Sequence, residues 1–185
     1  MSKYSKLHKL KDKMEKDDSL PLKKGANKLV FGSGNTETKI LLIGEGPGRT
    51  EDLQGLPFVG QAGKLLDKLL ELASLERKKV FITNIVHHRP PENRDPLPNE
   101  IKDYGKYLDK IIEIINPKVI ITLGRFSMAK FLPNVFISDV HGKVFDVGGF
   151  KIIPMYHPAA SLRNGKILTA EKQDFVNLKN MVQLT

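Results

Sequence analysis

Cysteine is absent from this sequence of 185 residues. Its absence excludes disulfide bonds, thiolate nucleophiles, and zinc or iron–sulfur sites held by cysteine sulfur. Several classes of metalloprotein and thiol enzyme are therefore excluded.

Long apolar runs are also lacking. No stretch approaches the roughly 18 apolar residues that a membrane-spanning helix requires. The first 18 residues, MSKYSKLHKLKDKMEKDD, carry too many charges for a secretory signal. We therefore expect a cytoplasmic protein without membrane contact, and its size suits a monomer with one core and a short arm.

Positive charge is in excess. The chain has 30 Lys and Arg residues against 21 Asp and Glu residues, a formal net charge of +9 at pH 7. Such an excess favours polyanionic partners, because each phosphate that a protein neutralises releases counterions. Charge alone does not separate a nucleic-acid-binding protein from one that is simply rich in lysine.

Apolar runs that alternate with helical patterns predict an α/β fold with a mostly parallel sheet. Residues 60–75 carry leucines on one helical face and charges on the other, which makes this the clearest helix. We expect strands at residues 28–35, 39–46, 79–86 and 118–124, a hairpin within 141–158 that leads into the last strand, and helices at 3–16, 60–75, 99–117, 125–133 and 170–184.

Ligands of such sheets bind beyond the carboxyl ends of the strands. This rule selects four segments here, residues 44–48, 84–89, 124–125 and 157–163. The first contains GEGPG, whose glycines allow a close backbone approach but whose spacing does not match a nucleotide-binding loop. Asn84, His157 and Phe58 each have an ordinary structural explanation, as a turn cap, a structural histidine and a core aromatic. Together they could stack against, read and polarise a flat heterocycle.

Several segments resemble, in order and spacing, the uracil-DNA glycosylase superfamily, and family 4 of it in particular. They are GEGPGRTED, GLPFVGQAGKLL, FITNIV with RPPENRDPLPNE, ITLG, and MYHPAASLR. The resemblance implies a three-layer α/β/α sandwich around a four-stranded parallel sheet, with residues 29–185 as one catalytic domain. Residues 1–28 are then a basic helix and linker that pack on it.

The resemblance implies hydrolysis of the N-glycosidic bond of uracil that has been flipped out of DNA. Phe58 is expected to stack on the base, Asn84 to bind its N3 and O4 edge, and His157 to donate to O2. An amide can accept from N3–H and donate to O4, whereas cytosine presents the opposite polarity. Extrusion of the base is required because the reacting atom is hidden within the duplex.

Two acids fall in or near the first motif. Glu45, together with the backbone at Gly46, is expected to handle the water and the sugar face, so that the catalytic set is Glu45, Asn84 and His157. Other families place a water-activating Asp where Gly46 stands, so catalysis here should depend mainly on stabilisation of the leaving group. Glu51 is expected in the uracil pocket, either to place water or to exclude a 5-methyl group.

The DNA contacts are also assigned from the resemblance. The segment HPAASLR corresponds to the loop that enters the minor groove, with Ser161 as a DNA contact, Leu162 as the wedge that fills the vacated stack, and Arg163 on phosphate. Arg89 and Arg94 are further candidates for phosphate contacts. A covalent link to DNA through a histidine, known in a related branch, is not expected, since that branch's basic insertion is missing.

Family 4 enzymes hold a [4Fe–4S] cluster on four cysteines, and this chain departs from that pattern. The matching positions are Asp17, Leu20, His88 and Tyr104. A cluster needs thiolates, so we predict an enzyme free of iron and sulfur, in which Leu20 and Tyr104 fill the space and His88 makes polar contacts.

No metal site is expected either. His87 and His88, with His141, could suggest one, but adjacent histidines on an extended segment point to opposite sides. Two alternative functions stay open at this point. The chain could be a catalytically weak DNA-binding member of the superfamily, or a glycosylase for hypoxanthine or xanthine.

Overall fold

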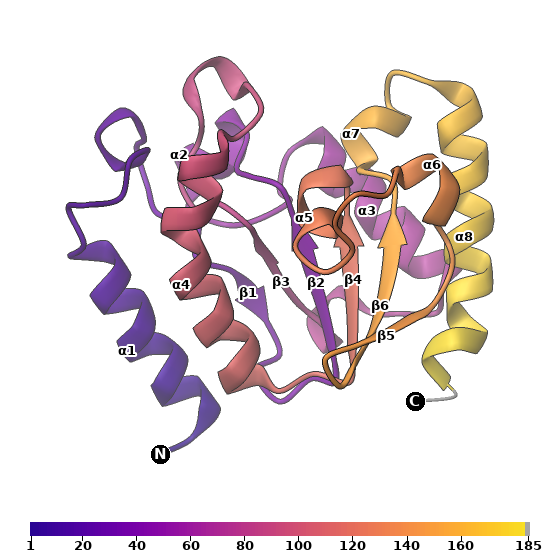
Figure 1. Cartoon of the computed structure of the whole chain (residues 1–185), viewed down its shortest axis with the longest axis horizontal. Helices are drawn as coiled ribbons and strands as arrows, with labels where there is room; N and C mark the ends of the chain where they lie inside the picture. Colours follow the sequence, from indigo (N-terminus) through magenta and orange to yellow (C-terminus); the bar gives the residue numbers. More distant parts are fainter. Residues whose placement is uncertain (184–185) are drawn as a thin grey trace.

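A computed structural model describes residues 1–183 and contains one six-stranded sheet at its centre (Figure 1). The strands lie in the order β1-β3-β2-β4-β6-β5. Their bounds are β1 Ser33–Gly34, β2 Ile40–Gly44, β3 Phe81–Asn84, β4 Val119–Leu123, β5 Phe145–Val147 and β6 Phe150–Met155.

The four central strands are parallel, as the sequence predicted. The pairs β2–β3, β2–β4 and β4–β6 are parallel, whereas β1 and β5 add short antiparallel edges. The sheet is therefore mixed and has two more strands than the four that the family resemblance implied. β2, β3 and β4 are buried on both faces, which explains why they appear as continuous apolar runs.

Helices cover both faces of this sheet. α1 (Lys3–Glu15) lies along α4 (Pro98–Ile115) on one side, and α3 (Gln61–Leu72) packs with α8 (Gly165–Gln183) on the other (Figure 1). Two hydrophobic clusters fill the layers between them and the sheet. The α/β/α arrangement follows from the sequence, because each long helix has one apolar face to bury.

The short elements differ most from the sequence predictions. α2 (Arg49–Gln54), α6 (Ile137–Val140) and α7 (Pro158–Ser161) were not expected, and α5 (Arg125–Ala129) is shorter than predicted. Helices of one or two turns have too few residues to show a 3.6-residue period. The 28–35 strand is reduced to β1, and single turns of 3-10 helix form at η1 (Lys23–Gly25), η2 (Arg77–Lys79) and η3 (Pro91–Asn93).

The last helix begins five residues earlier than predicted, at Gly165. Asn164 precedes it and accepts hydrogen bonds from the backbone N–H groups of Lys166 and Ile167 through Oδ1, at 3.0 and 3.3 Å. An Asn in this position accepts hydrogen bonds from the free N–H groups at the start of a helix. The spacing of apolar residues does not show this capping, so it did not predict where the helix begins. The predicted end at residue 184 lies outside the described residues.

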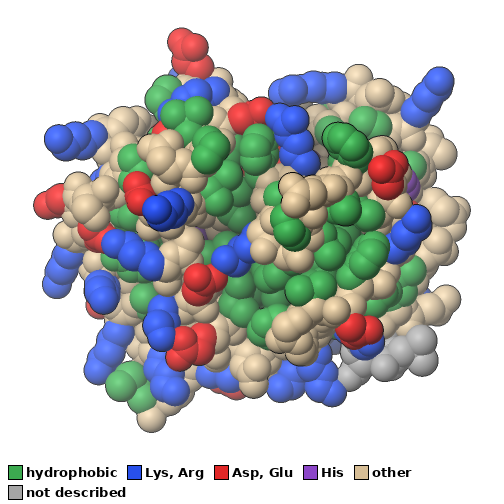
Figure 2. Space-filling model, in the orientation of Figure 1, with side chains coloured by type: hydrophobic (Ala, Val, Ile, Leu, Met, Phe, Trp, Pro, Cys, Tyr) green, Lys and Arg blue, Asp and Glu red, His purple; other side chains and the backbone are tan. Residues whose placement is uncertain are grey.

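The surface carries its charge broadly. On the face seen in Figure 2, Lys and Arg side chains are spread around the periphery, and hydrophobic side chains gather over α5, β5 and β6. No helix within residues 1–183 is both long and apolar enough to span a membrane. On this face the positive charge is spread out rather than gathered in one patch (Figure 2).

Candidate active site

A cleft of about 340 Å³ opens at the carboxyl ends of the parallel strands. Each strand end contributes at a similar level, because the register pairs Gly44 with Asn84 and Leu123 with Met155. Six of the residues predicted from the sequence line this one cleft: Glu45, Gly46, Glu51, Phe58, Asn84 and His157. The residues that the sequence selected at separate strand ends are therefore neighbours in space.

Phe58 is held in the cleft by a strained turn. Its φ is +50°, a left-handed conformation that is costly for a bulky side chain. Glu51 stabilises this turn, because its Oε1 accepts hydrogen bonds from the backbone N–H groups of Val59 and Gly60 at 2.9 and 2.8 Å. A Cβ on Gly63 would lie 1.9 Å from the carbonyl oxygen of Phe58, so α3 can pack against the turn only through glycine.

Asn84 ends β3 and is 1% exposed. Its Oδ1 has no hydrogen-bond partner among the residues that the structure describes. A buried acceptor without a partner costs free energy, which marks a position where a ligand can supply the missing donor. Gly44 makes room for this amide, since a Cβ there would lie 2.4 Å from Asn84 Oδ1 and 2.6 Å from the Phe58 ring.

His157 caps the start of α7, and its ring stacks beside Phe58 with centroids 5.6 Å apart and an interplanar angle of 29°. Its Nδ1 accepts a hydrogen bond from the backbone N–H of Ala159 at 3.1 Å. Burial lowers the pKa of His157 to about 4. The ring is therefore neutral near pH 7 and carries its proton on Nε2, which leaves one N–H donor.

Glu45 follows β2 and is largely removed from water. Burial is the main cause that raises its pKa to about 7, and the negative charge of Asp95 adds to this effect. Its Oε1 accepts a hydrogen bond from the backbone N–H of Phe126 at 3.1 Å. Gly124, at φ +102°, leaves the space that this carboxyl group occupies, since a Cβ there would lie 2.3 Å from Glu45 Oε1.

The candidate DNA contacts have different surroundings. Leu162 is 50% exposed and Arg163 is exposed beside the cleft. Arg94 also lines the cleft, but its guanidinium forms two hydrogen bonds with Glu100, at 2.9 and 2.7 Å. Arg89 donates to Asn93 at 2.6 Å, and Ser161 is buried. Contact of these residues with DNA stays a prediction.

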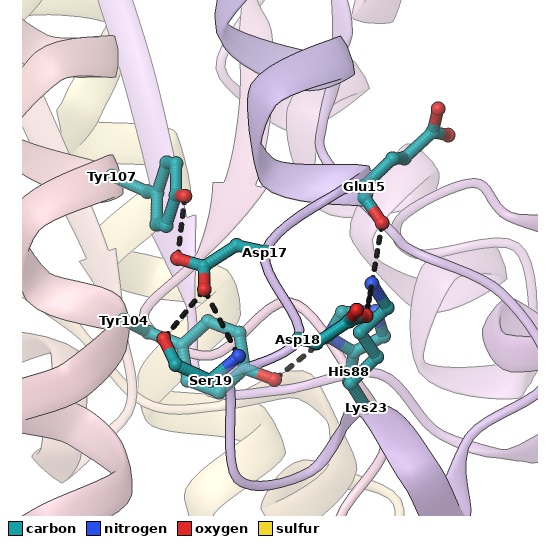
Figure 3. A network of polar contacts seen from close by, with 8 residues as sticks. All are labelled: Glu15, Asp17, Asp18, Ser19, Lys23, His88, Tyr104 and Tyr107. Atoms are coloured by element: carbon teal, nitrogen blue, oxygen red, sulfur yellow. Dashed lines mark hydrogen bonds and ion pairs between the residues drawn. The ribbon is translucent and has the colours of Figure 1, made fainter.

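The four positions where family 4 enzymes carry cluster cysteines contain no thiolate. His88 Nδ1 lies 2.7 Å from the Tyr104 hydroxyl, and burial lowers the pKa of His88 to about 4 (Figure 3). Asp17 accepts from the Tyr107 hydroxyl at 2.7 Å, and Leu20 is buried in the same core cluster as Tyr104. His88 and Tyr104 are partners of each other, Asp17 has other partners, and the donor set of the four positions does not fit an iron–sulfur cluster.

Two further histidines, His87 and His141, also have partners. His87 Nε2 lies 3.2 Å from the Thr83 hydroxyl, and His141 Nδ1 lies 2.7 Å from Asp174 Oδ2. Within residues 1–183, no group of three or more potential ligands is arranged to hold a metal ion. The adjacent histidines 87 and 88 have different hydrogen-bond partners, although both rings lie near Tyr104.

A parallel sheet here presents an aromatic ring, an amide with an unpartnered acceptor and a neutral imidazole to one cleft, a set of groups that fits a flat, polar heterocycle. Comparison with known families then identifies the group. Residues 31–179 match the model of the uracil DNA glycosylase superfamily, and the chain belongs to that superfamily.

Its similar relatives are type-4 uracil-DNA glycosylases. The protein from Archaeoglobus fulgidus is 45% identical over 164 residues, which cover 83% of this chain and 82% of the relative. The protein from Saccharolobus solfataricus is 43% identical, with 91% and 82% covered, and that from Thermotoga maritima is 44% identical, with 83% and 81% covered.

Sequence reasoning missed several residues that contact the cleft residues or the α7 turn beside them. Gly124 lies in one of the four selected segments, yet its role in admitting Glu45 depends on a contact across 79 positions of the chain. Glu100 and Glu171 were not singled out, because both lie within helices as ordinary charged residues. Both carboxyl groups are buried, with exposures of 4% and 0%, and this burial can be seen only in the folded structure.

Proposed function

We propose that this chain is a uracil-DNA glycosylase that flips uracil out of DNA and hydrolyses its N-glycosidic bond. The observation that carries the proposal is the shared cleft of Phe58, Asn84 and His157, in which Asn84 has a buried acceptor without a partner. Membership of the superfamily and the names of the relatives support the same activity.

The amide of Asn84 provides the selectivity. It accepts from N3–H of uracil through Oδ1 and donates to O4 through Nδ2, while Phe58 covers the face of the ring. Cytosine offers an acceptor at N3 and a donor at C4, so both partners would stay unpaired. A mismatch of this kind costs roughly 1–3 kcal/mol for each buried group.

His157 stabilises the leaving group. Cleavage of the glycosidic bond leaves negative charge on uracil and an oxocarbenium-like sugar. A neutral imidazole with its proton on Nε2 donates to O2 as this charge develops, and such a donor is worth about 3–4 kcal/mol in the transition state. The donor is in place beforehand because the N–H of Ala159 holds Nδ1 as the acceptor.

Glu45 acts on the opposite side of the bond. In its ionised form the carboxylate complements the cationic sugar and holds the incoming water, with the backbone at Gly46 beside it. With a pKa of about 7, close to half of these groups are ionised at neutral pH. Glu51 orients Phe58 through the turn that it holds.

The DNA is bent and opened by the α7 loop. Leu162 enters the vacated stack and Arg163 binds phosphate, with Arg89 and Arg94 as further phosphate contacts. The reaction needs no iron–sulfur cluster, since none of the steps above uses one and no residue at the aligned positions is a thiolate. The purified protein should therefore contain no stoichiometric iron.

The test is incubation with single-stranded and duplex oligonucleotides that contain uracil, followed by alkali to cut abasic sites. We expect scission with the native protein, and a loss of about a hundredfold or more in the His157→Ala and Asn84→Asp variants. His8→Ala and Asn180→Asp are matched controls, because both residues are exposed and far from the cleft in sequence and fold.

The alternatives give different results. DNA binding without scission would identify a catalytically silent member. Scission of hypoxanthine or xanthine oligonucleotides in preference to uracil would identify a glycosylase for another deaminated base. Either outcome would overturn the proposal.

A further inference from the structure

Glu171 is a buried acid outside the cleft that the mechanism above does not use. It lies in α8, is 0% exposed, and accepts a hydrogen bond from the Ser161 hydroxyl through Oε2. Its Oε1 has no partner among residues 1–183. A buried carboxyl group with a single serine partner costs stability relative to an apolar side chain of similar size.

The surroundings of Glu171 do not explain its presence. A charged group that acts on Glu171 is Asp174. Asp174 is paired with His141 and lies against Gly142, where a Cβ would lie 2.3 Å from Asp174 Oδ1. Burial, with the charge of Asp174 as a second cause, raises the pKa of Glu171 to about 7. Among residues 1–183 the carboxyl group has no cationic partner, and its hydrogen bond is the one from Ser161.

The hydrogen bond of Glu171 joins it to α7, the turn proposed to meet DNA. α7 contains four residues, of which Ser161 is the last. Two backbone hydrogen bonds hold this turn together. The N–H of Ala160 donates to the carbonyl oxygen of His157 at 2.8 Å, and the N–H of Leu162 donates to the carbonyl oxygen of Pro158 at 3.1 Å. The Ser161–Glu171 bond is a side-chain link from this turn to a long, packed helix.

We propose that Glu171 is a positioning residue, which holds α7 through Ser161 so that Leu162 projects toward the DNA duplex. This inference rests on the proposed function. Ser161 then contributes to DNA recognition by fixing the loop, since its buried hydroxyl is already occupied.

The proposal predicts an effect that depends on the substrate. A uracil in a single strand has no partner base and little stacking to replace, so it needs no wedge. Loss of the anchor should therefore lower the rate on duplex DNA and leave the rate on single strands almost unchanged. A purely structural role for Glu171 would reduce both rates together.

The experiment compares Ser161→Ala, Glu171→Leu and Glu171→Gln in single-turnover excision on matched single-stranded and duplex uracil oligonucleotides. We expect Ser161→Ala and Glu171→Leu to lower the duplex rate about tenfold, the effect of one lost buried hydrogen bond, with single-strand rates within about twofold of the native protein. Glu171→Gln keeps an acceptor for Ser161 and should retain the native ratio. Gln173→Ala, exposed on the same helix, is the control.

A double variant tests the route through the wedge. Leu162→Ala should also lose duplex activity selectively, and adding Ser161→Ala to it should have little further effect, because both changes act on the same step. Equal losses on both substrates, no loss at all, or a Glu171→Gln variant as impaired as Glu171→Leu would each overturn the proposal. If the native protein excises uracil from neither substrate, it is the proposed function that fails. If Glu171→Leu does not fold, Ser161→Ala still decides.

Discussion

Replacing Glu45 by glutamine should make the protein more stable and less active, and both effects should depend on pH. Burial raises the pKa of Glu45 from 4.5 to about 7 in the folded protein. At about 1.4 kcal/mol for each pH unit, keeping this carboxylate charged in the fold costs about 3 kcal/mol above pH 7. Glutamine has a similar shape and no charge, so it removes this cost.

The sign of the pH dependence follows from proton counts. Below about pH 4.5 the carboxyl group is protonated in the folded and unfolded states alike, and it contributes no difference. Between about pH 4.5 and 7 the folded state keeps a proton that the unfolded chain has lost, so the native protein loses stability as the pH rises. Glu45→Gln should therefore match the native protein in urea denaturation near pH 4.5 and exceed it by about 3 kcal/mol near pH 8.

Activity should change in the opposite direction. If the carboxylate complements the sugar cation, the native single-turnover rate should rise with pH through about 7 as Glu45 ionises. Glu45→Gln should lower the rate about a hundredfold at pH 8 and remove this rise. His157 should not contribute, since its pKa of about 4 keeps it neutral over this range.

Glu171 also has a pKa of about 7. Its contribution to the pH dependence of the rate must therefore be distinguished from that of Glu45. The Glu171→Gln variant, measured in parallel, should keep the native rise in rate because Glu171 does not touch the base or sugar. The reasoning is refuted if Glu45→Gln retains the native pH–rate profile, or if it shows no gain in stability between the two pH values.

Two further changes test the packing around the site. Gly44→Ala would place a methyl group 2.4 Å from Asn84 Oδ1, so we expect a loss of about a hundredfold in excision rate from the displaced amide, with a small change in melting temperature. Tyr107→Phe removes the 2.7 Å bond to Asp17 and should cost about 1 kcal/mol in urea denaturation at pH 7. The hydrogen bond from Lys106, followed by those from Ser19 and Tyr107, holds the pKa of Asp17 well below its usual range. Asp17 therefore stays ionised in the folded protein, and the loss should be unchanged between pH 7 and about 4. Tyr4→Phe, on an exposed ring, should change nothing.

The central sheet and the long helices could be predicted because their signals are local. Residues 40–44 are apolar throughout and residues 119–123 are apolar except for Thr122, as expected of strands buried on both faces. Residues 60–75 repeat leucine at helical spacing. The edges could not be predicted equally well. β1 and β5 have two and three residues, and each depends on a neighbouring strand for its hydrogen bonds rather than on its own pattern.

The site shows the same division between local and long-range information. Asn84 and His157 could be selected because they follow strands, and parallel strands end at one edge of a sheet. The contacts that tune them could not be selected. The link between Ser161 and Glu171 and the space that Gly124 leaves for Glu45 depend on how separate elements pack.

The cleft is also where locally unfavourable features of the chain coincide. Phe58 has a positive φ, Asn84 has a buried acceptor without a partner, and Glu45 has a carboxyl group whose ionisation is opposed by burial. Other residues with positive φ, such as Asn116 and Asn134, are of a type that tolerates this conformation, whereas a phenylalanine is not. Each feature lowers stability in the free protein. One flat ligand could stack on the ring that the turn holds in place, donate to the amide and develop positive charge beside the carboxylate. An extruded uracil nucleotide at the point of bond cleavage meets all three conditions.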